Sequence, residues 1–164
     1  MTRLRLFLAA GLGAALVACT PGSGAVRLEA REGRVVDRDT RAAVPGADVY
    51  QVYWGRGVAG EPRPAYALRW TTAAGDGGFA FEDRLSTEPR SWVLETDAAE
   101  YGFYHVDYGL VRRGPARGGE EVLLEGARLD EARRRAEALT LCGSRPADEV
   151  AAHVARSHCV TGSR

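Results

Sequence analysis

Most of the chain beyond residue 25 consists of short runs in which apolar and polar residues alternate, or in which β-branched and aromatic residues predominate. Such runs are typical of β-strands. They lie at residues 26–29, 33–37, 48–54, 66–72, 78–81, 92–96, 104–111 and 121–125. Turn-forming Gly, Pro and Asp residues separate them, and no helical pattern intervenes. The pattern predicts a mainly β fold, a seven- to eight-stranded antiparallel β-sandwich over residues 25–126.

The periodicity changes after Gly126. Apolar residues in the segment 128–142 recur three or four positions apart, which predicts a helix with a narrow apolar stripe formed by Leu129, Ala132, Ala136 and Leu139. Gly143 suits the end of this helix. A second helix is expected with Pro146 in its first turn and Asp148 and Glu149 near its positive end. Its apolar side comprises Val150, His153, Val154 and Ser157. Residues 127–164 are therefore expected to form a C-terminal helical hairpin.

The run 48–54 is apolar on both faces of the expected strand. Tyr50, Val52 and Trp54 alternate with Val49, Gln51 and Tyr53. One face belongs to the sandwich core, and we expect the C-terminal helices to cover part of the other. In the alternative interpretation this face binds a glycan or a protein, because exposed aromatic patches mark interaction sites. The candidate ligand-binding aromatics are Tyr53, Trp54, Trp70 and Tyr104.

Three segments together resemble the carboxypeptidase regulatory-like domain, a transthyretin-like (prealbumin-like) β-sandwich. They are 33–37 (Gly-Arg-Val-Val-Asp), 44–49 (Val-Pro-Gly-Ala-Asp-Val) and 72–81, which ends in Asp-Gly-Gly-Phe-Ala-Phe. The family pattern differs at Ala74, where Asp is usual, in the long Gly- and Pro-rich insert at 55–64, and in the helical tail. The resemblance implies a non-catalytic module.

Within these motifs, individual residues have expected roles. Asp37 caps the turn that follows its strand, and Pro45-Gly46 directs Ala47 and Val49 into the core. Asp76 and Gly77 are expected to supply the positive-φ residues of a tight hairpin. Phe79 and Phe81 are expected to lie on one face as core anchors.

The first 24 residues have the organisation of a bacterial lipoprotein signal. Arg3 and Arg5 precede an apolar stretch that is too short for a membrane span, and Leu16-Val17-Ala18-Cys19 resembles a lipobox. We expect cleavage after residue 18, lipidation of Cys19, and a flexible tether over residues 19–24. Thr20 in place of Asp favours the outer membrane, with the domain facing the periplasm.

Composition narrows the function further. The chain has 22 basic residues, all of them Arg, and 22 acidic residues. The balance gives no field that would attract nucleic acid, and the absence of Lys excludes lysine chemistry. The expected partners are the membrane, through the lipid at Cys19, and an envelope protein or glycan whose identity the sequence does not reveal.

Two cysteines remain after Cys19 is lipidated. In an oxidising periplasm we expect Cys142 and Cys159 to form a disulfide. A helix from 146 to 159 would be about 20 Å long, so either this helix ends early, or the link 142–146 doubles back along it, or the first helix folds back. The rival interpretation is a zinc site of these cysteines with His153 and His158, although the spacing matches no common zinc finger. No metal and no cofactor is expected.

One segment could serve catalysis. Asp97, Glu100, His105 and Asp107 lie in an aromatic-rich stretch, and paired carboxylates with a histidine can act as general acid and base. The sequence contains none of the common nucleophile, zinc-protease or phosphate-loop motifs. We therefore expect a non-enzymatic envelope module; a carbohydrate- or peptidoglycan-binding lipoprotein is the alternative, and a metal- or carboxylate-dependent hydrolase is a remoter one.

Overall fold

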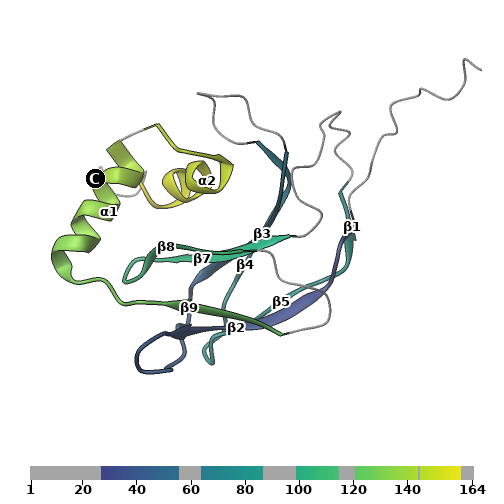
Figure 1. The fold of residues 1–164 in the computed structure, drawn as a ribbon, viewed down its shortest axis with the longest axis horizontal. Coiled ribbons are helices and arrows are strands. Elements are labelled where there is room, and N and C mark those ends of the chain that lie inside the picture. Colours follow the sequence, from purple (N-terminus) through teal and green to yellow (C-terminus); the bar gives the residue numbers. More distant parts are fainter. Residues whose placement is uncertain (1–26, 56–63, 87–98, 115–120, 144, 160–164) are drawn as a thin grey trace, which may run out of the picture.

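The computed structural model describes residues 27–55, 64–86, 99–114, 121–143 and 145–159. Cys19, Thr20, the signal segment, the expected strand at 92–96 and Asp97 lie outside these residues. The described part is mainly β, with sheets of two to four strands and two C-terminal helices (Figure 1).

Short strands and two helices follow one another along the chain. The strands are β1 (Arg27–Leu28), β2 (Arg31–Asp37), β3 (Asp48–Trp54), β4 (Ala65–Thr72), β5 (Gly78–Phe81), β6 (Arg84–Leu85), β7 (Glu100–His105), β8 (Gly109–Arg113) and β9 (Val122–Gly126). The helices are α1 (Glu131–Gly143) and α2 (Glu149–His158). The bounds of β3 and β5 are those predicted from the alternation of side chains.

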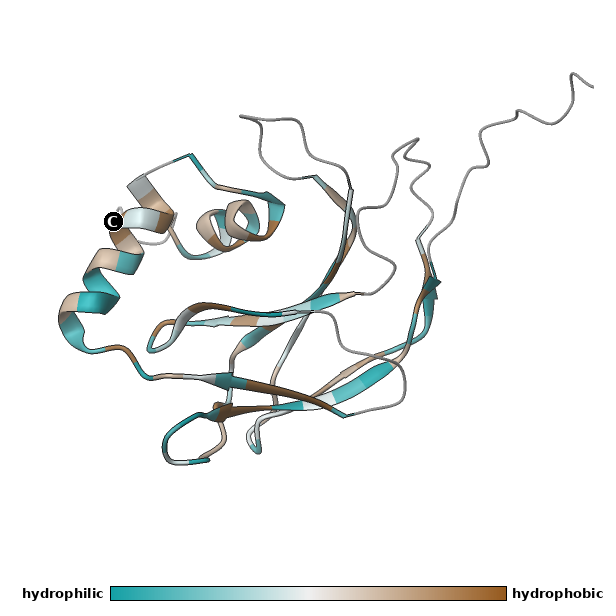
Figure 2. Ribbon diagram, viewed as in Figure 1, coloured by the Kyte–Doolittle hydropathy of each residue, from teal (hydrophilic) through white to brown (hydrophobic). Residues whose placement is uncertain are grey.

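Among the described strands, a three-stranded sheet in the order β5-β2-β9 and a four-stranded sheet in the order β4-β3-β7-β8 contribute to a common hydrophobic cluster. Figure 2 shows hydrophobic residues along the strands of both sheets. The buried residues shared by this cluster include Val35, Phe79, Phe81, Val122 and Leu124 from the first sheet and Val49, Tyr53, Ala67, Tyr101 and Phe103 from the second. The predicted core anchors Ala47, Val49, Phe79 and Phe81 are all buried.

The sequence led us to expect that all strand pairs would be antiparallel, but one pair is parallel. β2 pairs with β9 in parallel, with Gly33 opposite Val122 and Asp37 opposite Gly126. The antiparallel prediction was wrong here because these strands are far apart in the sequence. Alternation of side chains defines a strand but carries no information about the direction of a distant partner.

The run 104–111, predicted as one strand, is divided between β7 and β8. The two strands form an antiparallel hairpin in which His105 lies opposite Gly109. Gly109 has a φ of 69°, a left-handed conformation that glycine adopts without steric cost. The aromatic and β-branched residues on both sides of this turn concealed it in the sequence.

A second hydrophobic cluster lies on the other face of the four-stranded sheet. Tyr50, Val52 and Trp54 of β3 and Ala65 of β4 pack with Val150 of α2, and all five are at most 3% exposed. Leu68, Trp70 and Leu110 pack against its edge. The prediction that the C-terminal helices cover the second face of β3 is thus confirmed for α2.

Helix α1 differs from the prediction in its orientation. It contains no buried residue; Ala132 and Ala136 of the predicted stripe are exposed, and Leu139 is 74% exposed. Polar groups instead hold the helix against the hairpin of β7 and β8. Arg134 Nη1 donates to Asp107 Oδ1 at 2.6 Å, and Glu137 Oε1 accepts from the Leu110 backbone N–H at 3.5 Å.

Candidate functional site

The four candidate aromatics do not share one face of the sheet. Tyr53 belongs to the cluster between the two sheets and is 9% exposed, whereas Trp54 lies under α2 and is 1% exposed. They are neighbours in β3, and successive side chains of a strand point to opposite faces. Tyr53 and Trp54 are therefore positioned as packing residues of two different clusters.

Trp70 and Tyr104 are half-buried on the face of the sheet that α2 covers. The indole of Trp70 stacks on the imidazole of His153, with ring centroids 4.3 Å apart and planes inclined by 14°. Tyr104 lies 4.4 Å from the ring of His158. His158 Nε2 is 2.9 Å from Asp48 Oδ2 at the start of β3. Each of these two aromatic rings therefore has a histidine of α2 against it, stacked at Trp70 and tilted by 43° at Tyr104.

Burial of the His153 imidazole lowers its pKa, and the neighbouring positive charge of Arg156 adds to this effect. The neutral ring is therefore favoured where it stacks on Trp70. The alternative zinc site included His153 as a ligand, but in the structure its ring packs on the indole of Trp70.

A polar network centred on Glu100 crosses the second cluster. One carboxylate oxygen accepts from the Tyr50 hydroxyl at 3.0 Å, and the other accepts from Trp54 Nε1 at 2.7 Å. Arg112 Nη1 lies 3.4 Å from Glu100 Oε1, and Arg112 Nη2 donates to Asp148 Oδ2 at 2.7 Å. Burial raises the pKa of the Tyr50 phenol, and the charge of Glu100 raises it further. The phenol therefore remains a donor to this carboxylate.

The network ends at Asp148, the residue immediately before α2. Asp148 is the N-cap, and its Oδ1 accepts from the Ala151 backbone N–H at 2.9 Å. Helix α2 consequently begins at Glu149, and Pro146 precedes it rather than occupying its first turn. The same carboxylate caps the helix and binds Arg112 of β8, so one residue sets where the helix starts and where it docks.

The other members of the candidate acid–base group have structural partners. The Asp107 backbone N–H donates to His105 Nδ1 at 3.1 Å. The Asp107 carboxylate binds Arg134 at 2.6 Å and Arg128 at 3.4 Å. Glu100 lies at the other end of β7, so the described members do not converge on a common reacting atom.

Cys142 and Cys159 form a disulfide, with their Cα atoms 5.5 Å apart. Cys142 lies in the last turn of α1, and Cys159 is the C-cap of α2. Because α2 extends to His158, the option that the second helix ends early is wrong, and Cys142 lies beside the C-terminal end of α2. The pairing uses both thiols of the alternative zinc site. In the described ranges, no three histidine, cysteine or acidic side chains are grouped as metal ligands would be.

A second buried carboxylate lies where β2 ends. Asp37 Oδ1 accepts from the backbone N–H groups of Asp39 and Thr40 at 2.9 and 2.7 Å, so it caps the turn as predicted. Its Oδ2 accepts from the Tyr108 hydroxyl at 2.9 Å, a contact that the sequence did not indicate. The bond from the Thr40 backbone N–H and that from Tyr108 lower the pKa of Asp37 to about 2. Burial, with the bond to Asp37, raises the pKa of Tyr108 to about 12.

The predicted hairpin turn before β5 is formed differently from expectation. Gly77 has a φ of 77°, as predicted, but Asp76 does not adopt a positive φ. The Asp76 carboxylate instead accepts from the Gly78 backbone N–H at 2.9 Å. A side-chain cap therefore supplies what we had assigned to a second left-handed residue.

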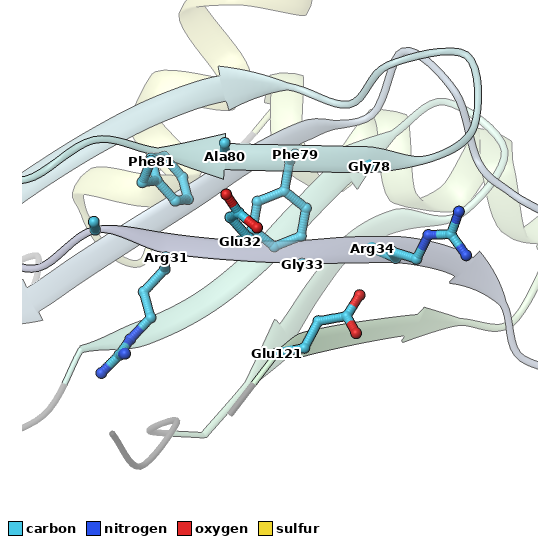
Figure 3. A pocket seen from close by; sticks show the side chains of 10 residues that line it. Arg31, Glu32, Gly33, Arg34, Gly78, Phe79, Ala80, Phe81 and Glu121 are labelled. Carbon is cyan, nitrogen blue, oxygen red and sulfur yellow. The ribbon is translucent and has the colours of Figure 1, made fainter. Parts of the chain in front are cut away.

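A groove of about 650 Å³ lies along β2 and β5, with Glu121, the residue before β9, at its border (Figure 3). Glu32, Arg34 and Glu121 bring charges of both signs to it, and Phe79 lies across Gly33. None of the candidate aromatic, histidine or cysteine residues borders this groove. It therefore does not join the residues that the sequence had singled out.

Comparisons of the chain with protein-family models, with characterised proteins and with solved structures gave no match. Neither α1 nor α2, nor any other described helical segment, has the length and hydropathy needed to cross a bilayer.

Proposed function

We propose that this protein is a lipoprotein of the bacterial cell envelope, anchored in the outer membrane through Cys19 and acting in the periplasm as a non-catalytic interaction or structural module. The observation that carries the proposal is the disulfide between Cys142 and Cys159. Disulfides persist in oxidising compartments such as the periplasm. Since the chain has three cysteines, this pairing leaves Cys19, the residue at the end of the lipobox, without an intramolecular partner among the cysteines.

We assign the domain to the transthyretin-like β-sandwich class that the motifs resemble. Two sheets contribute to one buried cluster, and the motif residues Ala47, Val49, Phe79 and Phe81 lie in it as expected. Asp37 caps its turn, and Gly46 and Gly77 adopt positive φ. These features support the assignment because each follows from a motif residue rather than from overall composition.

The assignment as a non-catalytic module is supported by the roles of the polar residues. Glu100 binds Tyr50, Trp54 and Arg112, and the Asp107 carboxylate binds two arginines. Each therefore stabilises the position of neighbouring elements. Burial of Trp54 and the His153 stack on Trp70 also favour a scaffold over an aromatic sugar-binding platform.

The proposal is tested by feeding an alkyne-tagged fatty acid to bacteria that express the full chain. We expect the protein to carry the tag and to fractionate with the outer membrane, because several acyl chains on one residue give durable anchoring. The Cys19→Ala variant should lose the tag and appear in the soluble fraction. Persistent acylation of that variant would contradict the assignment of Cys19.

A second variant tests the choice of membrane. Thr20→Asp should move the lipidated protein to the inner membrane of an enteric host while leaving the fatty-acid tag in place. An unchanged outer-membrane location would contradict our reading of Thr20 without affecting Cys19.

A further inference from the structure

Helix α2 covers the second hydrophobic cluster and is fastened at both ends. It buries three side chains, those of Val150, Ala151 and Val154. At its N-terminal end, Asp148 binds Arg112 of β8 at 2.7 Å. At its C-terminal end, His158 lies 2.9 Å from Asp48, and the disulfide at Cys159 follows directly. A partly exposed polar pair contributes little to stability, so the disulfide is the stronger fastening at this end.

The disulfide joins α2 to a helix that has no buried residue, and the two helices lie side by side (Figure 1). Polar contacts of Arg134 and Glu137 hold α1 against the hairpin of β7 and β8. With the bond closed, Cys142 and Cys159 are the fixed ends of a loop, 17 residues apart in the sequence. Helix α2 therefore gains little freedom when it leaves the sheet. Breaking the bond frees its C-terminal end, and the entropy of a loop of this length favours the detached helix by a factor on the order of 100.

The two cysteines differ in their accessibility to a reductant. Cys142 is exposed, whereas Cys159 is half-buried at the end of α2. A thiolate of a dithiol, such as the active-site pair of a thioredoxin-like oxidoreductase, can therefore form a bond with Cys142 Sγ. The bond between the two Sγ atoms breaks, and Cys159 leaves as a thiolate that takes up a proton. The second thiol then displaces Cys142, so the dithiol is oxidised to a disulfide and both cysteines are reduced.

We propose that the Cys142–Cys159 bond is a redox latch, whose reduction by a dithiol lets α2 detach from sheets that stay folded. Detachment exposes the face formed by Tyr50, Val52 and Trp54, which the helix otherwise buries. The sheets keep their common core, because no residue of the first hydrophobic cluster belongs to α1 or α2. The latch does not depend on lipidation, since both of its cysteines lie after β9.

The test is amide hydrogen exchange, followed by mass spectrometry of peptides from α2 and β2. The full chain carries Cys19→Ala, so that the only thiols come from the latch and the result is independent of the proposed anchoring. Exchange is compared in the oxidised chain and in dithiothreitol, at several urea concentrations below the unfolding transition. The matched control carries Cys142→Ser and Cys159→Ser in addition and cannot form the bond.

We expect reduction to speed the exchange of the α2 amides on the order of 100-fold. Their exchange should depend only weakly on urea, because little surface is exposed when the helix alone detaches. The β2 amides should remain slower and depend strongly on urea, and the serine control should match the reduced chain with and without dithiothreitol. An unchanged exchange rate of α2 on reduction would overturn the inference. The same exchange free energy and urea dependence for α2 and β2 in the reduced chain would also overturn it, because the helix would then leave only when the whole domain unfolds.

A second measurement tests the reduction itself. Thioredoxin that lacks its second active-site cysteine should be trapped on the oxidised chain as a mixed disulfide with Cys142. Absence of an adduct would overturn the redox role of the bond. An adduct confined to Cys159 would overturn the assignment of Cys142 as the sulfur that is attacked.

Discussion

Helix α2 should contribute to stability mainly through the burial of Val150. This side chain is fully buried against Tyr50, Val52 and Trp54. Val150→Ala removes two methyl groups, which costs about 1.6 kcal/mol in transfer free energy at roughly 0.8 kcal/mol per group. The cavity that remains adds to this cost, so we expect a total loss of about 2–3 kcal/mol in the free energy of unfolding.

For a chain of this size, the loss corresponds to a fall in Tm of roughly 4–10 °C. The assay is thermal unfolding of the soluble domain followed by circular dichroism, with urea unfolding as a second measure. The matched control is Leu139→Ala in α1. It removes more apolar volume, but from a side chain that is 74% exposed, so Tm should change little.

The comparison between these two variants is decisive for the docking of the helices. Equal losses of stability in both variants, or a loss confined to Leu139→Ala, would refute the reasoning that α2 covers the sheet while α1 presents its apolar stripe to solvent. An unchanged Tm for Val150→Ala would refute the packing of the second cluster.

Three further outcomes follow from the polar groups and the disulfide. Asp148→Ala should lower the stability of the domain by about 1–2 kcal/mol through loss of the helix cap, while Asp148→Asn should cost less because an amide oxygen still caps; urea titrations of both variants measure the difference. The pKa of Asp37 is lowered to about 2 from its ordinary value of 3.8, so its contribution to folding stability is complete above about pH 4 and is lost as the pH falls toward 2. An Asp37→Asn variant should show a flatter dependence of Tm on pH in that window, and an unchanged slope would contradict the hydrogen-bonding role. Cys142→Ala paired with Cys159→Ala should cost about 3 kcal/mol, as expected for a loop closed over 17 residues, and a reduced wild-type protein should unfold at the same urea concentration as this double variant.

The sequence predicted best what depends on local patterning. The bounds of β3 and β5 follow from alternation, and the cap at Asp37 follows from its place before a turn. Burial of both faces of β3 was also predictable, because between Val49 and Trp54 its residues are apolar at every position but one. Gln51, the exception, is fully buried, and its side chain bonds to Tyr101 and Arg69.

What the sequence did not predict depends on distant partners. The parallel pairing of β2 with β9 is decided by the route of the intervening chain. The stripe on α1 predicted burial, but Arg134 and Glu137 direct the opposite side of the helix toward the hairpin. The candidate aromatics were grouped by residue type, and the strand placed Tyr53 and Trp54 on opposite faces.

The position of α2 has a consequence for how the protein matures. Helix α2 follows every described strand in the chain, so during synthesis from the amino terminus the strands of the three- and four-stranded sheets emerge before the helix that covers one face of the latter. Until then the face that carries Tyr50, Val52 and Trp54 is open to water and to other chains. The disulfide can form only after α2, which ends next to Cys159, has been synthesised. The time between the emergence of β3 and the closure of this disulfide is therefore the period in which a chaperone would protect this domain from aggregation.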